Sequence, residues 1–558
     1  MLALNRLNLS NLRGDLLGGV TAAVVSLPLA LTFGVASGAG AEAGLYGAIL
    51  IGLFAALFGG TSTLISEPTG PMTVVMTAVV SSMIAANPDN GLAMAFTVVI
   101  MAGLFQIAFG FMRLGKYITL MPYSVVSGFM SGIGVILILM QLGPALGQAA
   151  PPGGVIGSLL AIPELLVNIR AAEFLLFVLA LAVLFKTPAR IKKYVPPQLI
   201  ALIGISIFSA LYLMADIDVR RIGEIDASLP SLVMPHFTHE QLGVMLVDAM
   251  VLGMLGCIDS MLTSVIADNL TRTEHDSNKE LVGQGLGNIV SGFFGGLPGA
   301  GATMGTVVNI QAGGRTALSG VIRVVALFIA VFGLATLIET IPLAVLAGIA
   351  VKVGLDILDW SFIRRAHKVS KHSTLIMYAV LILTVLVDLM VAVGVGVFVA
   401  NVIIIQKLSA AEAENIKSMS DVDDSIPLDV EQRELLNSAD GRLLLFYLSG
   451  AMIFGVSKAL ARERKYIERH DAVIFDISDV TFLDDTMSLS LENVIVEALD
   501  MGKHVGVVVG SDLAKEKLLN LGLSEHLPLE QFTHSRTDAL RQALDYIQRH
   551  REAQIPQG

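Results

Sequence analysis

One stretch decides the fold: Gly295-Gly296-Leu297-Pro298-Gly299-Ala300-Gly301-Ala302-Thr303-Met304-Gly305-Thr306. It lies inside a long apolar region, where its glycines and its proline interrupt any continuous helix. A broken segment cannot face lipid, because its N–H and C=O groups would be left without hydrogen-bond partners. The stretch must therefore be buried in protein or line a polar cavity.

An earlier stretch has the same character: Ser66-Glu67-Pro68-Thr69-Gly70-Pro71-Met72-Thr73. Two interrupted apolar segments, one in each half of a membrane protein, typically mark the substrate site of a transporter. We expect half-helices to begin at Thr69 and at Thr303, with their N-terminal ends facing each other.

The composition indicates that most of the chain lies in a membrane. Its 558 residues are 54% hydrophobic and 15% charged, whereas soluble domains carry about 25% charged residues. Residues 1–408 hold 21 basic and 21 acidic residues, and residues 409–558 hold 15 basic and 26 acidic ones. The acidic tail argues against nucleic acid or anionic lipid as its partner. The single cysteine, Cys257, excludes an intramolecular disulfide.

Fourteen apolar spans are predicted. They lie at 16–34, 42–60, 69–86, 92–112, 120–145, 171–186, 196–214, 243–262, 281–295, 302–313, 317–335, 339–358, 374–387 and 389–406. Several are too short to cross roughly 30 Å of hydrocarbon as straight helices. Two repeats of seven are expected, and an odd number per repeat makes the second repeat inverted. The broken segments are then the third and tenth spans, and Pro28 predicts an interruption of the first span.

The positions of lysine and arginine predict the orientation of the spans. With the N-terminus inside, the loops that carry most of these residues fall on the cytoplasmic side. These residues are Arg6, Arg13, Arg113, Lys116, Lys186, Arg190, Lys192, Lys193, Arg272, Lys279, Arg315, Arg323, Arg364, Arg365, Lys368 and Lys371. The main exception is the outside pair Arg220 and Arg221. The same orientation places the acidic tail in the cytoplasm.

The C-terminal part, 441–558, is predicted to be a soluble α/β domain. Strands are expected at 441–448, 472–476 and 504–509, and helices at 456–467, 487–499, 512–521 and 537–551. The residues between the transport domain 1–408 and this domain, 409–440, are acidic and polar. We expect them to form a mobile linker.

Asp259 is the most informative single residue, because it follows the nearly apolar run 244–258. A carboxylate near the membrane middle costs about 3 kcal/mol and usually pairs with a cation or lines a pathway. Thr263 lies one turn further on the same helix face. With backbone carbonyls of 299–301, these side chains would form an oxygen-rich site suited to Na⁺ or a proton. The alternative is that Asp259 is merely solvated at the cytoplasmic end of its helix.

Thr69 and Thr303 allow two interpretations. Free N–H groups and the dipole at a helix start attract anions, so both threonines could contact an anionic substrate. A threonine in this position is also a common N-cap, which needs no substrate.

Other charged residues are assigned to structure or to the surface. Glu67 and Asp248 are predicted to be solvated, and Lys352 and Asp356 are spaced for a helical i,i+4 pair. There is no G-x-x-x-x-G-K-[ST] loop, no H-E-x-x-H helix and no paired C-x-x-C. The sequence therefore predicts a transporter that is not driven by ATP, and no enzyme.

These motifs together resemble the SulP family of anion transporters, over nearly the whole chain. The matching motifs are Gly18-Gly19-Val20-Thr21-Ala22-Ala23-Val24-Val25-Ser26-Leu27-Pro28, Gly44-Leu45-Tyr46, Pro68-Thr69-Gly70 and Gly296 to Thr306. Asp476-Ile477-Ser478-Asp479-Val480-Thr481-Phe482-Leu483-Asp484-Asp485-Thr486 resembles part of a STAS domain. The resemblance implies a core domain and a gate domain, elevator-like motion and homodimers, in part through the cytoplasmic STAS domain.

Two stretches, Leu31 to Gly40 and Leu64 to Thr73, resemble a branch of this family, the BicA-type sodium-dependent bicarbonate transporters. This resemblance implies Na⁺/bicarbonate symport in the inner membrane of a bacterial cell, with both termini in the cytoplasm. It implies that bicarbonate is held by Thr69, Ala302 and Thr303. It also implies that Na⁺, the co-transported ion, is held by Asp259, Thr263, Gly301 and Thr303.

Gly305 supports the same interpretation. Many members of the family have an arginine at this position, two residues after Thr303, which helps to balance the charge of the anion. Without that arginine, a Na⁺ at Asp259 would balance the charge. A monovalent anion is then easier to bind than sulfate.

Three questions stay open at this point. Thr486 aligns with a phosphorylated position of related STAS domains, but Asp485 precedes it in place of the usual serine, so a regulatory phosphosite there is only an alternative to a dimerisation role. A proton-coupled sulfate or dicarboxylate transporter is the second functional hypothesis. A channel, or a membrane-anchored signalling protein, is the third.

Overall fold

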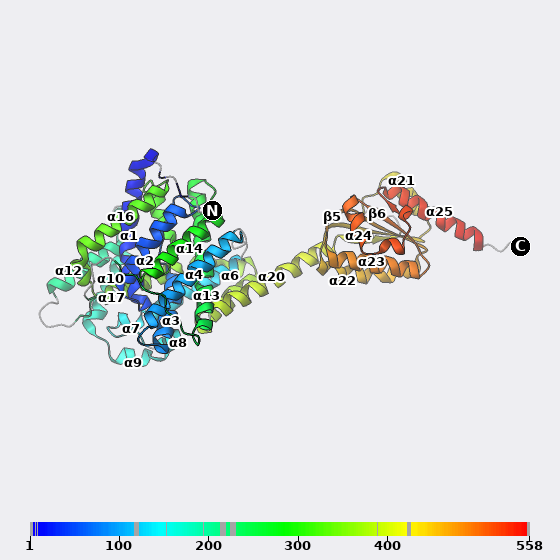
Figure 1. Cartoon of the computed structure of the whole chain (residues 1–558). Helices are drawn as coiled ribbons and strands as arrows, with labels where there is room; N and C mark the ends of the chain where they lie inside the picture. Colours follow the sequence, from blue (N-terminus) through cyan, green and yellow to red (C-terminus); the bar gives the residue numbers. More distant parts are fainter. Residues whose placement is uncertain are drawn as a thin grey trace. The chain divides into compact units, whose positions relative to one another are not determined.

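The computed structural model describes residues 4–5, 7, 9–115, 122–151, 153–192, 195–212, 219–223, 230–387, 389–420 and 426–554. The chain forms two compact units, 1–400 and 401–558, and the boundary falls inside one helix, α20 (Leu389–Ala413) (Figure 1). Some residues used above for topology and for the linker lie outside the described residues, namely Arg6, Lys116, Lys193 and the acidic segment 421–424.

The first unit is built almost entirely from helices. They are α1 (Leu12–Ser37), α2 (Ala41–Phe58), α3 (Gly70–Ala86), α4 (Gly91–Phe111), α6 (Tyr123–Met140), α7 (Leu142–Ala145), α8 (Gly154–Leu160), α9 (Ile162–Val167), α10 (Ala171–Lys186), α11 (Ala189–Lys192), α12 (Pro197–Tyr212), α13 (Leu242–Thr271), α14 (Ser277–Phe293), α15 (Thr303–Gln311), α16 (Ala317–Glu339), α17 (Leu343–Ile357), α18 (Trp360–Val369), α19 (Lys371–Leu386) and α20.

Helices from the two halves of the chain pack together. The early helices α1 and α2 lie beside the later helices α16 and α14, and α4 packs between α13 and α14 (Figure 1). A second group is formed by α6, α10, α12, α17 and α19, in which α6 contacts α17 and α19. With two groups of helices, the first group can carry a binding site and the second group can form the opposite wall of that site.

The described helices account for many of the predicted spans. Six are long and apolar enough to cross a membrane, the longest being α13 with 30 residues. The apolar helices α3 and α19 fall short of that length, with 17 and 16 residues. The expectation that some spans are too short is thus met in α3 and α19. The total of fourteen spans and the seven-plus-seven repeat stay predictions.

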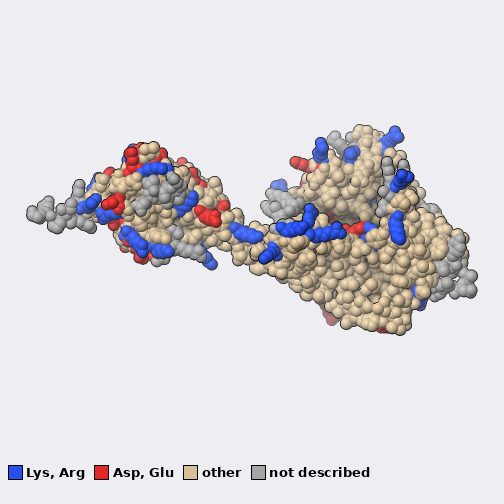
Figure 2. Space-filling view, turned by 180° about the vertical axis from the view of Figure 1, so that it is seen from behind, with Lys and Arg blue, Asp and Glu red and all other residues tan. Residues whose placement is uncertain are grey.

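The surface of the first unit fits a lipid environment. Figure 2 shows a wide face of this unit with few charged side chains, whereas the second unit carries charges of both signs. Many large apolar side chains are exposed on its helices, among them Leu104, Phe185, Ile207, Ile329, Leu375, Ile382 and Phe398. An apolar face of this kind is costly in water and favourable in a bilayer.

The two broken segments meet, as the sequence predicts. Short strands β1 (Ser66–Glu67) and β2 (Ala300–Gly301) pair antiparallel, with Ser66 opposite Gly301 and Glu67 opposite Ala300. Two residues separate the end of β1 from the start of helix α3, and one residue separates the end of β2 from the start of helix α15. The pairing supplies the hydrogen bonds that the interrupted backbone needs at membrane depth.

The predicted interruption of the first span at Pro28 is wrong. Helix α1 is 26 residues long and runs through Pro28 without a break. The carbonyl of Pro28 still accepts a hydrogen bond from the Thr32 hydroxyl, at 2.7 Å. Neighbouring helices pack so closely there that a β-carbon on Gly44 of α2 would lie 1.9 Å from the Ala30 carbonyl oxygen. Packing on both sides therefore stabilises a helix that a proline alone would bend.

The surface assignment of Glu67 is also wrong, as is the loop position of Arg323. Arg323 lies within α16 and is 1% exposed, and Glu67 is 2% exposed. Their side chains form an ion pair with an Nη2–Oε2 distance of 2.5 Å. Arg323 also donates to the Ser26 hydroxyl and to the carbonyls of Ala48 and Ser66, each at 3.0 Å. The pair ties β1 to three helices.

The second unit is an α/β domain with one five-stranded sheet. The strands are β3 (Ile416–Met419), β4 (Leu443–Met452), β5 (Ala472–Leu483), β6 (His504–Val509) and β7 (Phe532–Thr533), in that spatial order. Only the β3–β4 pair is antiparallel. The helices are α21 (Val430–Ser438), α22 (Ser457–Glu463), α23 (Asp485–Asp500), α24 (Asp512–Asn520) and α25 (Arg536–Gln554).

Helices cover both faces of this sheet. Side chains of α22, α23 and α24 share one hydrophobic cluster with Phe446 and Phe475, whose rings stack with centroids 5.3 Å apart. Side chains of α21 and α25 share another cluster with Leu445 and Ile474, which point to the opposite face. The segment 409–440 differs from a simple linker, because it contains β3 and α21, and both belong to this unit.

Candidate functional site

Asp259 lies in the interior of α13, not at its end. The helix continues to Thr271, so the alternative that Asp259 is a solvated helix terminus does not describe its position. Its side chain is 7% exposed, and its Oδ2 atom has no hydrogen-bond partner among the described residues. A buried carboxylate with an unsatisfied oxygen is costly and points to a missing cationic or protic partner.

Oxygen atoms gather one turn further along α13. The Thr263 hydroxyl donates to the Gly301 carbonyl at 2.8 Å and lies 2.9 Å from the Thr303 hydroxyl. The Gly301 N–H donates to the Ser260 hydroxyl at 3.0 Å. Ser260 is a residue that the sequence interpretation missed, although it directly follows Asp259. The helix thus holds β2 through side chains on both sides of Gly301.

Thr69 is the N-cap residue of α3, but its side chain makes no capping hydrogen bond. Its hydroxyl is buried and has no hydrogen-bond partner among the described residues. The hydroxyl lies close to the carboxylate of Asp259. Capping therefore does not account for Thr69, whose hydroxyl instead lies beside the Asp259 carboxylate.

Ala302 and Thr303 form the start of α15. Ala302 is the N-cap, and its own N–H is used in a 2.8 Å hydrogen bond to the Ile65 carbonyl. The N–H groups of 303–305 have no carbonyl partner within the helix, because the first turn of any α-helix leaves them free. They can attract an anion, as can the dipole of the half-helix.

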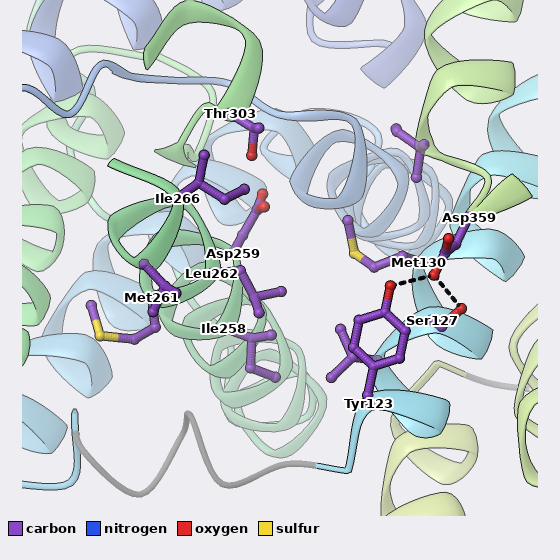
Figure 3. A pocket seen from close by; sticks show the side chains of 13 residues that line it. Tyr123, Ser127, Met130, Ile258, Asp259, Met261, Leu262, Ile266, Thr303 and Asp359 are labelled. Carbon is purple, nitrogen blue, oxygen red and sulfur yellow. Dashed lines mark hydrogen bonds between the residues drawn. The ribbon is translucent and has the colours of Figure 1, made fainter. Parts of the chain in front are cut away.

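Of the predicted site residues, Asp259 and Thr303 line a cavity of about 460 Å³, whereas Thr69, Thr263, Gly301 and Ala302 are not among its lining residues. It is lined by Tyr123, Val126, Ser127, Met130, Ile258, Asp259, Met261, Leu262, Val265, Ile266, Thr303, Ile357 and Asp359. Asp259 and Thr303 lie on one wall (Figure 3). Tyr123, Ser127 and Asp359, from α6 and the α17–α18 connection, form the opposite wall (Figure 3). The remaining lining is apolar.

The cavity has a marked charge asymmetry. Two of its lining residues, Asp259 and Asp359, carry carboxylates, and no lysine or arginine is among the described residues that line it. Charges interact strongly in such a partly apolar space, because the surroundings screen them less than bulk water does. An anion that enters alone therefore meets negative charge, and a cation is attracted.

Polar side chains behind the cavity hold the broken segment in place. Asn288 of α14 accepts from the Gly299 N–H at 2.8 Å and donates to the Gly299 carbonyl at 2.9 Å. Its amide also donates to Gln106 of α4 at 2.8 Å. Asn288 and Gln106 lie in predicted apolar spans. An amide side chain in such a span is a sequence signal that could have marked both residues as supports of the broken segment. They satisfy backbone groups that neither helix nor sheet can satisfy.

Gly305 sits where space is short. A β-carbon there would lie 3.0 Å from Cγ2 of Ile65 and 3.3 Å from Oε1 of Glu67. That Glu67 oxygen has no hydrogen-bond partner among the described residues. Gly305 is therefore tightly packed against β1 and the residue before it.

Thr486 belongs to the second unit of the chain. It is exposed in the first turn of α23 in the second unit, where Asp484 caps the helix by accepting from the Met487 N–H. The capping residue Asp484 is followed by Asp485, and the Thr486 side chain after them lies at the surface.

The apolar surface, the two broken segments and the cavity beside two helix starts define a multi-pass membrane protein of the transporter class. A profile of the sulfate permease family matches residues 12–380. The chain belongs to this family.

Relatives of the chain match it over nearly its full length. It is 58% identical over 552 residues to the bicarbonate transporter BicA of Synechocystis sp., covering 99% of this chain and 98% of that one. It is 56% identical over 543 residues to the bicarbonate transporter BicA of Picosynechococcus sp., covering 97% and 96%.

Solved structures share the fold. The transmembrane domain of a cyanobacterium bicarbonate transporter BicA is 66% identical, with a TM-score of 0.67, and matches 70% of this chain and 99% of that one. SLC26A9 is 17% identical, with a TM-score of 0.80, and matches 98% of this chain and 92% of that one. At this low identity, SLC26A9 supports the fold alone.

Proposed function

We propose that the protein is a Na⁺/bicarbonate symporter. The observation that carries the proposal is the buried carboxylate of Asp259, which has an unsatisfied oxygen beside the start of α15. The names of the two relatives above support bicarbonate as the substrate. In this proposal Na⁺ and bicarbonate bind next to each other and drive one another's binding.

The proposed Na⁺ ligands are Asp259, Thr263, Thr303 and the Gly301 carbonyl. All of them offer oxygen, the atom that hard cations prefer. In the described structure the Thr263 hydroxyl lies within hydrogen-bond distance of both Gly301 and Thr303. A cation at this point would be held by the charge of the carboxylate and by the oxygen lone pairs of groups that now hydrogen-bond to one another.

Bicarbonate is proposed to bind at Thr69 and at Ala302 and Thr303. The Thr69 hydroxyl and the first amides of α15 are hydrogen-bond donors of the kind that hold a small oxyanion. Since the Ala302 N–H is used by Ile65, Ala302 would contribute through its position, not as a donor. The two ions neutralise each other, so each raises the affinity for the other by the same factor.

The transport cycle is proposed to be of the elevator type. The half-helices and α13 would move as a core against the wall formed by α6 and α17. We further propose that the protein is a homodimer in the inner membrane of a bacterial cell with both termini in the cytoplasm. The second unit is proposed to be a STAS domain that takes part in dimerisation, with Thr486 as its candidate regulatory phosphosite.

The variant Asp259→Asn tests the proposal. Bicarbonate uptake into membrane vesicles is measured with Na⁺ and with choline in its place. We expect Na⁺ stimulation to disappear and uptake to fall at least tenfold, because the amide removes the charge but keeps the shape. Asp248→Asn on the same helix is the matched control and is expected to retain Na⁺ stimulation.

Full uptake with unchanged Na⁺ dependence in Asp259→Asn would refute the Na⁺ mechanism. Wild-type uptake that is indifferent to Na⁺ but driven by a proton gradient, with sulfate or a dicarboxylate as the better substrate, would favour the second functional hypothesis. Transport that never saturates with substrate would favour a channel.

A further inference from the structure

The wall opposite Asp259 carries a second polar cluster, which we call the Asp359 cluster: Tyr123, Ser127 and Asp359. The Tyr123 hydroxyl donates to Oδ2 of Asp359 at 2.7 Å, and the Ser127 hydroxyl donates to the same atom at 2.8 Å (Figure 3). The other carboxylate oxygen, Oδ1, accepts from the Phe362 N–H at 3.0 Å. The cluster is therefore held in a fixed geometry at the cavity surface.

The cluster presents oxygen and negative charge only. Three side-chain oxygens meet at Oδ2 of Asp359, and both hydroxyl oxygens keep lone pairs after they donate. Such a set suits a hard cation, with water completing its shell. It does not suit an anion.

Nearby basic side chains do not neutralise Asp359. Lys352 pairs with Asp356, which lies about one turn before Asp359 in the sequence. Arg365 donates to the carbonyl and hydroxyl of Ser361. Among the described residues, no ion pair reaches Asp359, although Arg365 lies close enough to Tyr123 to act on its hydroxyl.

The position of the Asp359 cluster indicates on which side of Asp259 it lies. Tyr123 begins α6, and Asp359 follows the end of α17. In the predicted topology both helix ends lie on the cytoplasmic side, whereas Asp259 lies in the interior of α13. A cation that leaves Asp259 for the cytoplasm crosses the same cavity that Asp359 faces.

We propose that the Asp359 cluster is a second, weaker Na⁺ station between Asp259 and the cytoplasm. This inference rests on the proposed function. The station receives a partly hydrated Na⁺ from Asp259 and releases it to the cytoplasm. Its charge also disfavours an anion that remains in the cavity after the cation has left, which keeps the release of the two ions coupled.

The test compares the two faces of the membrane. Na⁺-dependent bicarbonate transport by the full-length protein is measured in inside-out vesicles, which expose the cytoplasmic face, and in right-side-out vesicles. In Asp359→Asn we expect the half-saturating Na⁺ concentration to rise about fivefold in inside-out vesicles, as for one unit charge at contact distance in a hydrated site. In right-side-out vesicles it should change less than twofold.

Asp356→Asn is the matched control. It removes the same charge three residues before Asp359, from a side chain that pairs with Lys352. We expect less than a twofold change in both orientations. The double variant Tyr123→Phe/Ser127→Ala keeps the charge and removes the oxygen ligands, and it should raise the same constant about threefold in inside-out vesicles. This variant decides the question if Asp359→Asn does not fold.

Three results would overturn the station. They are an unchanged constant in both Asp359 cluster variants, an equal rise on both faces, and a rise of the same size in Asp356→Asn. In each of these cases a Na⁺-dependent wild type would leave the proposed function intact. A wild type without Na⁺ dependence on either face would refute the proposed function and the station together.

Discussion

The buried pair of Glu67 and Arg323 makes a prediction that tests the packing around the broken segments. Both side chains are nearly inaccessible, at 2% and 1% exposed. Removing one partner of such a pair leaves an uncompensated buried charge, which costs about 3–5 kcal/mol. We therefore expect Glu67→Gln, which keeps the size of the side chain, to destabilise the first unit by about that amount.

The expected shift in unfolding temperature follows from the size of the unit. Unfolding entropy is about 2.1 cal/mol/K per residue, or roughly 0.8 kcal/mol/K for about 400 residues, so a loss of 3–5 kcal/mol lowers the midpoint by about 4–6 °C. The measurement heats the detergent-solubilised protein in steps and follows the remaining monodisperse fraction by size-exclusion chromatography. Asp89→Asn, an exposed carboxylate, is the control and should shift the midpoint by less than 1 °C.

A double-mutant cycle separates the pair from its neighbours. Arg323→Met should be as harmful as Glu67→Gln, while the double variant should lose no more than either single one, since no unpaired charge remains. A coupling free energy of about 3 kcal/mol is expected. Additive losses in the double variant, or a Glu67→Gln protein as stable as the wild type, would refute the reasoning.

Three further changes have definite expected outcomes. Gly44→Ala should lower the thermal midpoint of the first unit by a few degrees, because its β-carbon would clash with the α1 backbone, whereas Gly204→Ala, with open space around it, should not. Arg536→Ala should make the second unit markedly more sensitive to limited proteolysis, because it removes the ion-pair partner of the fully buried Asp476. Burial lowers the pKa of His504 below its usual 6.5, so protonation favours the unfolded state, and the stability of the second unit should fall as pH drops below about 6.5. The fall should be smaller in His504→Gln, as measured by thermal unfolding at pH 7.5 and pH 5.5, and an equal fall in both proteins would contradict the assignment.

Local patterns in the sequence predicted much of the architecture. The strand at 504–509 and the helix at 512–521 match β6 and α24 to within a residue, because their apolar periods and flanking turns are local signals. The broken segments were predicted for a similar reason, since glycine and proline interrupt a helix wherever they lie. Asp259 stood out because a carboxylate is costly within an apolar membrane span and usually has a functional role there.

Features that depend on distant pairing could not be predicted in the same way. Glu67 and Arg323 are 256 positions apart, and nothing near either residue indicates that they meet. Asp359 lies in a polar helix connection close to Asp356, where one sequence cannot distinguish a side chain that faces a cavity from one at the surface. The continuity of α1 through Pro28 likewise depends on neighbours that hold the helix from both sides.

The pairing of β1 with β2 also imposes an order on biogenesis. The hydroxyl of Thr306 accepts the N–H of Ile65, from 241 positions earlier in the chain. At about 5–20 residues per second, the ribosome needs roughly 10–50 s to supply the second segment after the first. During that interval the earlier segment has no strand partner at membrane depth, so it must be shielded by water or by the insertion machinery. A nascent chain that stops before residue 295 should therefore be a preferred substrate for membrane quality-control proteases.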